Sequence, residues 1–163
     1  MVAIGRVGAR GARIIVASVL VTAALLVAGV LPPKPVGPPR VFVNWTESMP
    51  LGMYRVTGGA VKAGSLVIFP GRVIPSFGLH LPEYLLKRVV SSQGEEVRVD
   101  GRGLSLGGKL VAPRVKSFGV RFAGKLPSVE VLVLGENPRS FDSRYFGPVA
   151  RRYLTRVKAI VTW

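Results

Sequence analysis

The sequence predicts a mainly β, antiparallel domain preceded by one N-terminal transmembrane helix. Three observations lead to this fold class. Residues 14–31 carry no charged side chain, the chain after residue 40 consists of short apolar runs broken by glycine and proline, and no segment after Leu31 has a helical period. A chain of 163 residues can form one domain with its own core in addition to this helix.

The N-terminal part is predicted to anchor the chain in a membrane. As a helix, residues 14–31 would be about 27 Å long, close to the thickness of a bilayer's hydrocarbon core. Arginines in residues 1–13 favour a cytoplasmic N-terminus, with the rest of the chain on the outer side. The alternative is a cleaved signal peptide, with Val27-Ala28-Gly29 as the cleavage site. Both interpretations export the domain.

A proline-rich spacer is expected at residues 32–40. Five prolines within residues 32–39 favour a stiff, extended chain that would hold the following domain near the bilayer.

Residues 41–163 are expected to form the exported domain. The runs Val41–Val43, Met53–Val56, Leu66–Phe69, Val129–Leu134 and Arg156–Val161 are typical of strands. Asp100-Gly101 and Gly107-Gly108 predict hairpin turns on either side of another strand. The apolar segment Leu66–Leu86 is interrupted by prolines, and it can line the core or rest on a membrane surface.

Composition limits the possible partners. Twenty-three Lys and Arg against eight Asp and Glu make the chain strongly basic, which suits an anionic partner. The basic residues are scattered and have few aromatic residues between them, which fits a solvated basic surface or, as the alternative, contact with lipid headgroups. We expect membrane lipid rather than nucleic acid as a partner. No cysteine is present, which rules out disulfides.

Ser48 is the first candidate functional residue. It lies between two predicted strands, in a turn favoured by Pro50 and Gly52, and such a turn presents a hydroxyl outward. Taken alone, this segment also fits an ordinary turn serine.

Lys87 is the second candidate, because it interrupts an apolar run. In a strand, Leu85, Lys87 and Val89 share one face and Arg88 points to the other. Burial lowers the pKa of a lysine, and the resulting amine can accept a proton from a serine. The alternative is an edge-strand lysine whose amine reaches solvent.

A third polar segment, residues 135–148, follows the apolar run that ends at Leu134. Ser140, Asp142 and Arg144 alternate, so in an extended chain they would lie on one side. Asp142 and Arg144 are expected to pair and to fix a loop beside Lys87.

The three segments together resemble the signal peptidase I superfamily. The resemblance rests on Ser-Met-Pro after a strand, then Leu-Lys-Arg-Val-Val, then Gly-Glu-Asn followed by Ser-Phe-Asp-Ser-Arg-Tyr-Phe-Gly. The first segment is most similar to the TraF-type peptidases of plasmid conjugative transfer, at Asn44, Thr46, Ser48, Met49, Pro50, Gly52 and Tyr54. The strand and tryptophan of Thr155–Trp163 also resemble that group.

This resemblance implies a signal-peptidase-like catalytic domain and assigns roles to residues. Ser48 would be the nucleophile and Lys87 the general base, while the Ser48 N–H and the Thr46 hydroxyl would hold the oxyanion. Ser140 would hydrogen-bond and orient the base, and Asp142 and Arg144 would support it. The sequence departs from the family at Gln93-Gly94-Glu95, where Pro-Gly-Asp is usual, and at Glu136, where aspartate is usual.

The expected function is a membrane-anchored serine endopeptidase with a Ser48–Lys87 dyad and no metal or cofactor. It would act on the periplasmic side of the inner membrane on an exported pre-protein, such as a conjugative pilin precursor, by cleavage or by cleavage with cyclisation. The alternatives are a general leader peptidase and a non-catalytic, membrane-tethered assembly factor of a pilus or secretion apparatus.

Two other chemistries use residues that are present. A Ser–His–Asp triad would need Ser48, His80 and Asp142, but the single histidine lies among apolar residues with no carboxylate beside it. One histidine and no cysteine cannot build a usual zinc site.

Overall fold

The computed structural model describes residues 37–91 and 93–163, which form one compact unit from Gly37 onward. The predicted basic terminus, the transmembrane segment 14–31 and residues 32–36 of the spacer lie outside the described residues. Within the described ranges, no helix is long and apolar enough to cross a membrane.

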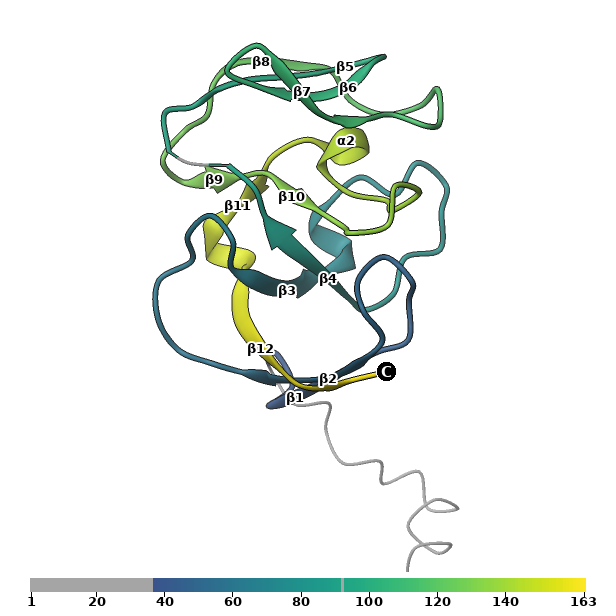
Figure 1. Ribbon diagram of the computed structural model, residues 1–163, viewed down its shortest axis with the longest axis vertical. Coiled ribbons are helices and arrows are strands. Elements are labelled where there is room, and N and C mark those ends of the chain that lie inside the picture. The colour runs from purple at the N-terminus through teal and green to yellow at the C-terminus, as the bar shows by residue number, and fades with distance from the viewer. Residues whose placement is uncertain (1–36, 92) are drawn as a thin grey trace, which may run out of the picture. The chain divides into compact units, whose positions relative to one another are not determined.

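The described chain is mainly β and antiparallel, as predicted (Figure 1). A six-stranded sheet has the order β1-β2-β12-β3-β4-β10, a four-stranded sheet has the order β7-β6-β5-β8, and β9 pairs with β11. The strands of the first sheet are β1 (Val41–Asn44), β2 (Gly52–Val56), β12 (Thr155–Thr162), β3 (Leu66–Pro70), β4 (Tyr84–Val89) and β10 (Val133–Leu134). The others are β5 (Glu96–Asp100), β6 (Gly103–Leu106), β7 (Lys109–Pro113), β8 (Phe122–Lys125), β9 (Glu130–Val131) and β11 (Val149–Ala150).

The two predicted hairpin turns are confirmed in the four-stranded sheet. Asp100 accepts a hydrogen bond from the Arg102 N–H at 2.8 Å, which closes the turn between β5 and β6. Gly107 and Gly108 both have positive φ, as a tight two-residue turn between β6 and β7 requires.

The run Val129–Leu134 is predicted as one strand, but the structure contains two. It divides at Leu132 into β9, which pairs with β11, and β10, which pairs with β4. Leu132 is fully buried, and its N–H bonds the Ser91 hydroxyl at 2.8 Å instead of continuing a ladder. Because of this break, the two halves of one apolar run belong to two different sheets.

One helical turn and two 3-10 turns lie between the strands, although no segment after Leu31 has a helical period. These are α2 (Ser143–Phe146), η1 (Gly71–Val73) and η2 (Arg151–Tyr153). Each is too short to show a helical period in the sequence. Asp142 caps α2, since its side chain accepts from the Arg144 N–H.

Three apolar clusters form the core. The largest joins β3 and β4 to β9, β11 and α2, through residues such as Val67, Phe69, Val89, Val131 and Phe146. A second lies under the four-stranded sheet, and a third, containing Met49, Tyr54, Ile68 and Leu86, lies beneath the loop between β1 and β2. Both faces of β4 are therefore covered.

The segment Leu66–Leu86 is buried in one part and exposed in another. Phe69 and Ile74 are buried in the core, whereas Phe77 and Leu79 are exposed. Phe77 has a φ of 50°, and its ring lies 5.7 Å from the ring of Phe118. The loop between β3 and β4 is thus held against an aromatic cluster at its tip.

Candidate active site

The loop between β1 and β2, residues 45–51, presents Ser48 next to a buried anchor. Asn44 is the last residue of β1 and only 1% exposed. Its side-chain N–H₂ group lies 2.9 Å, 3.0 Å and 3.0 Å from the carbonyl oxygens of Thr46, Met49 and Pro50. The loop therefore closes around one amide group, which holds the backbone on both sides of Ser48.

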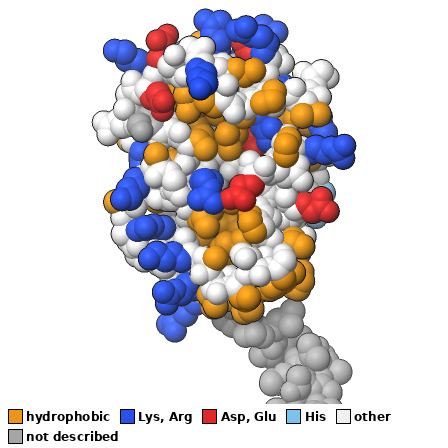
Figure 2. Space-filling model, viewed as in Figure 1, with side chains coloured by type: hydrophobic (Ala, Val, Ile, Leu, Met, Phe, Trp, Pro, Cys, Tyr) orange, Lys and Arg blue, Asp and Glu red, His pale blue; other side chains and the backbone are white. Residues whose placement is uncertain are grey.

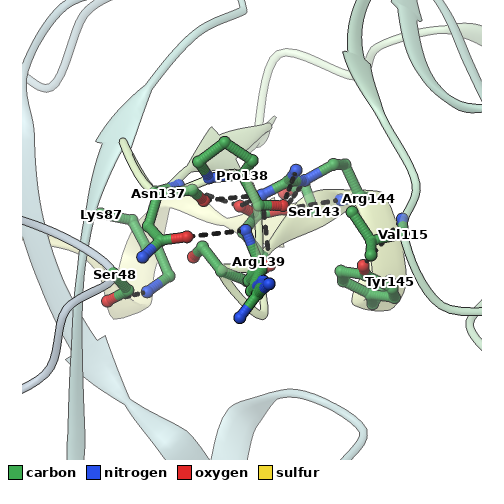
Figure 3. Close-up of polar contacts among 12 residues, drawn as sticks. Ser48, Lys87, Val115, Asn137, Pro138, Arg139, Ser143, Arg144 and Tyr145 are labelled. Carbon is green, nitrogen blue, oxygen red and sulfur yellow. Dashed lines mark hydrogen bonds and ion pairs between the residues drawn. The ribbon is translucent and has the colours of Figure 1, made fainter.

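Lys87 points inward from the middle of β4, as the alternation predicts. It is 2% exposed and pairs with Val67 of β3, between the buried residues Leu85 and Val89. Its Nζ donates a hydrogen bond to Ser48 Oγ at 2.8 Å, and Figure 3 shows the two side chains pointing toward each other. The structure therefore excludes the alternative, in which Lys87 lies on an edge strand and its amine reaches solvent.

Burial changes the acidity of this lysine. Desolvation lowers the pKa of Lys87 to about 8, while the Asp142 carboxylate raises it and the Arg144 guanidinium lowers it. At neutral pH about a tenth of such a group is uncharged, compared with less than a thousandth for a lysine in water. The site therefore supplies a usable base near physiological pH.

The segment after β10 packs against the loop between β1 and β2 that carries Ser48. The Glu136 N–H donates to the Ser48 carbonyl oxygen at 2.8 Å, and the Asn137 N–H approaches the same oxygen at 3.4 Å. The Glu136 side chain, one methylene longer than the aspartate usual in the family, forms an ion pair of 2.6 Å with Arg88 on β4. The loop that carries Ser48 and the strand that carries Lys87 are thus both bonded to the chain after Leu134.

Asp142 and Arg144 pair as predicted, but the chain between them is not extended. Asp142 precedes a helical turn, so Ser140, Asp142 and Arg144 do not line one side of a strand as expected. The buried ion pair has an N–O distance of 2.7 Å, and Asp142 also accepts from the Gly135 N–H at 2.9 Å.

Arg144 organises the surrounding loop through its remaining hydrogen atoms (Figure 3). Its guanidinium donates to backbone carbonyl oxygens of two separate segments, at Pro113 and at Asn137, Pro138 and Ser140 of one loop. No hydrogen bond joins Asp142 or Arg144 to Ser48 or Lys87 in the described structure, so they act on the dyad through charge and through the loop.

Ser140 differs from its expected role. It is 4% exposed, but its hydroxyl has no hydrogen-bond partner among the described residues, and the expected bond to Lys87 is not formed. Its oxygen is packed against Gly135. The loop from Asn137 to Ser140 is closed by a bond from the Ser140 N–H to the Asn137 carbonyl at 2.9 Å, which fixes where this hydroxyl can reach.

Thr46 lies where the resemblance expects an oxyanion donor. Its hydroxyl oxygen is 3.1 Å from Ser48 Oγ and 2.8 Å from Asn44 Oδ1. Within the described structure, the Ser48 N–H takes no part in the hydrogen bonds of the loop. The Ser48 N–H is thus an available donor beside the serine oxygen, and the Thr46 hydroxyl lies next to it.

Sequence reasoning assigned no role to Asn44, Gly135 or Arg88, although all three contact the site. An isolated polar residue at the end of a strand has no period that would reveal its contacts. The need for glycine at Gly135 arises from Ser48 and Ser140, which are distant in sequence.

The rival chemistries receive no geometric support. His80 is exposed and lines a surface pocket formed by the loop between β3 and β4. Ser48 is bonded to Lys87 and Asp142 to Arg144, and no hydrogen bond among the described residues joins either of them to His80. Over residues 37–91 and 93–163, no group of three His, Asp or Glu side chains is arranged to hold a metal ion.

Comparison with known proteins agrees with the arrangement of these three segments. The family model for signal peptidase, peptidase S26, matches residues 10–163, and the chain belongs to this family. Within the superfamily it is TraF-like. Two proteins from Escherichia coli named plasmid transfer protein TraF are 29% and 28% identical to it, over 150 and 147 residues. Each alignment covers 74% of this chain and 82% of the relative.

More distant similarities lie in the same superfamily. A probable signal peptidase I-2 from Synechocystis is 32% identical over 101 residues, which covers 57% of this chain and 44% of the relative. A crystal structure of a signal peptidase I from Enterococcus faecalis V583 aligns with a TM-score of 0.38 and 22% identity, over 65% of this chain and 100% of that chain.

Replacing Lys87 with methionine should make the domain more stable at pH 7. The folded-state pKa of about 8 lies below the ordinary 10.5, so burying the ammonium group costs about 3 kcal/mol below pH 8. That cost disappears as the pH rises through 10.5. The difference in the free energy of unfolding between the variant and the wild type should therefore decrease over the same range. Urea unfolding of both proteins at pH 7 and pH 10 measures this; a variant less stable than the wild type at pH 7 would contradict it.

Gly135→Ala should destabilise the docked loop. An added Cβ would overlap the Ser140 side chain and lie 2.6 Å from the Ser48 carbonyl oxygen, so the backbone must move. Overpacking of this kind costs about 1–3 kcal/mol. Gly101→Ala is the matched control, because no atom lies within 4 Å of its added Cβ. Thermal unfolding measures the difference. An equal decrease in Tm for both variants would contradict the close packing of Gly135 against Ser140 and Ser48.

Proposed function

We propose that this chain is a membrane-anchored serine endopeptidase with a Ser48–Lys87 dyad. The observation that carries the proposal is the 2.8 Å hydrogen bond between Lys87 Nζ and Ser48 Oγ, made by a lysine that is 2% exposed. A lysine used only for solubility would keep its amine in water, whereas this one is desolvated against a hydroxyl.

In the proposed reaction the uncharged Lys87 amine takes the Ser48 proton while Ser48 Oγ bonds to the peptide carbonyl carbon. The Ser48 N–H and the Thr46 hydroxyl stabilise the oxyanion. As the C–N bond breaks, Lys87 returns the proton to the leaving amine. Water then attacks the acyl-enzyme, giving a proton to Lys87, which passes it to the departing Ser48 oxygen.

An extended peptide is the substrate that the sheet can accept. β4 pairs with β3 from Tyr84 to Arg88, but with β10 only at Arg88 and Val89. The side of β4 before Arg88 therefore lacks a strand partner among the described residues, next to Lys87. A substrate strand added there would bring its carbonyl group to Ser48.

The proposed substrate is an exported pre-protein of a plasmid transfer system, such as a pilin precursor. Support comes from the two relatives named plasmid transfer protein TraF, of which this chain covers 82%. If the substrate's own N-terminus replaces water in the second step, the same acyl-enzyme yields a cyclic product. The Synechocystis relative supports a second candidate, a general leader peptidase, through its name and 32% identity.

We place the active site on the periplasmic face of the inner membrane, near lipid. The uncharged residues 14–31 precede the domain by a short, proline-rich spacer. Exposed apolar side chains gather at the end of the domain formed by β1, β2 and β12 (Figure 2), and they include Trp45 and Trp163, with rings 6.0 Å apart. Basic side chains are scattered over the same view, as suits anionic headgroups.

Ser48→Ala and Lys87→Ala should each abolish processing of a candidate pilin precursor, lowering the rate by at least about a thousand-fold. His80→Ala and Lys62→Ala are the matched controls, because both side chains are exposed. Mass spectrometry of the precursor after incubation with the full chain in membranes gives the cleavage site. A further loss of one water reveals cyclisation. Full processing by either dyad variant would favour the assembly-factor function instead, and cleavage of a leader peptide alone would favour the leader peptidase.

The rate of processing should rise with pH through about 8. Lys87 must be uncharged to act as the base, and burial lowers its pKa to about 8, so the protonated and inactive form dominates below that value. As the pH falls from 8 to 6, kcat/KM should decrease more and more steeply. The slope should approach a roughly ten-fold decrease per pH unit well below the pKa of Lys87. A rate constant that stays level from pH 8 down to pH 5 would exclude Lys87 as the base.

A further inference from the structure

The serine hydroxyl lies within a chain of three hydrogen bonds that ends on Asn44. Lys87 Nζ is 2.8 Å from Ser48 Oγ, Ser48 Oγ is 3.1 Å from Thr46 Oγ1, and Thr46 Oγ1 is 2.8 Å from Asn44 Oδ1. Either hydroxyl could be the donor in the middle contact. The direction of the chain therefore depends on where the Thr46 hydrogen points.

The surroundings of Asn44 fix the orientation of its amide group. The nitrogen faces three carbonyl oxygens within 3.0 Å, and the oxygen faces the Thr46 N–H at 3.2 Å. Exchanging the two atoms would place an oxygen against three acceptors and an N–H₂ group against a donor. The atom that faces the Thr46 hydroxyl is therefore the amide oxygen.

The direction follows from counting hydrogens. Asn44 Oδ1 carries no hydrogen, so its 2.8 Å contact must use the single hydrogen of the Thr46 hydroxyl. Thr46 Oγ1 then presents only lone pairs to Ser48 Oγ. In the free protein Thr46 is thus an acceptor for Ser48, although oxyanion stabilisation requires it to donate.

We propose that Asn44 is a positioning residue that holds the Thr46 hydroxyl hydrogen away from Ser48 until an oxyanion draws it out. This deepens the proposed function, on which its catalytic meaning rests. Asn44 acts through Thr46 and the loop backbone, and it touches neither the substrate nor Ser48 Oγ.

The arrangement couples Thr46 to the charge on Lys87. When Lys87 is protonated it donates to Ser48, Ser48 donates to Thr46, and Thr46 donates to Asn44, so every contact contains one hydrogen. Only uncharged Lys87 can accept the Ser48 hydrogen, as the general base must, and the Ser48–Thr46 contact is then left with two facing lone pairs. The hydrogen bond from the Thr46 hydroxyl to Asn44 therefore favours the charged form of Lys87 over the uncharged form.

The test is a direct titration of Lys87 in the full chain in detergent micelles. Side-chain NMR of ¹³C-labelled lysine gives its midpoint, and the resonance is assigned by its loss in Lys87→Met. The charged groups that act on Lys87, Asp142 and Arg144, stay unchanged in the test variants, and so does the nearby ion pair of Arg88 and Glu136.

Thr46→Val should lower the Lys87 midpoint by about half a pH unit, because the charged form loses the acceptor for the Ser48 hydrogen. If Thr46 instead donated to Ser48, the same change would raise the midpoint. A raised or unchanged midpoint overturns the proposal. Thr57→Val is the control, since the Thr57 hydroxyl bonds the distant Arg156 carbonyl and should leave Lys87 unaffected.

Asn44→Ala should also lower the midpoint, and this shift should vanish in the Thr46→Val background. Equal shifts in both backgrounds would mean that Asn44 only supports the fold, which overturns the proposal. If Asn44→Ala does not fold, the sign of the Thr46→Val shift decides alone. The titration needs no turnover, so inactivity toward every precursor would count against the proposed function and leave this inference standing.

Discussion

The desolvation of one ammonium group beside one hydroxyl is the constraint on which the rest of this structure depends. Lys87 is held in the middle of a strand covered on both faces, where its charge has little water to stabilise it. Asp142 and Arg144 lie close enough to act on it, but they oppose each other, so their pairing leaves burial as the largest influence on the lysine. Without the arginine, the carboxylate alone would oppose the effect of burial and raise the pKa of Lys87.

The loop around Arg144 shows how this balance is kept in place. Its guanidinium is bonded to Asp142 and to carbonyl groups of two chain segments, so the cation can be buried without leaving donors unsatisfied. Arg114 continues the network by donating to the Arg144 carbonyl and by lying over the Tyr145 ring. The four-stranded sheet is thereby joined to the loop that supports the dyad.

Much of this arrangement could be predicted from local patterns. Alternation placed Lys87 on the buried face, and glycine pairs located the hairpins, because both signals depend on neighbours in sequence. The placement of β12 between β2 and β3, the division at Leu132 and the helical turn after Asp142 depend on distant partners, which no local period encodes. Within the site, the Asp142–Arg144 pair was predictable from spacing and opposite charge. The contacts of Asn44 and the unpaired hydroxyl of Ser140 were not, because each depends on the course of the backbone through three dimensions.

The bond from the Glu136 N–H to the Ser48 carbonyl has a consequence for the order in which the site is assembled. Ser48 and Lys87 leave the ribosome well before the segment that docks on them. Until that segment has been made and folded against the β1–β2 loop, the chain contains both reactive groups without the geometry that joins them. The contact between Ser48 and Lys87 is thus supported only once the last of the three segments has been made.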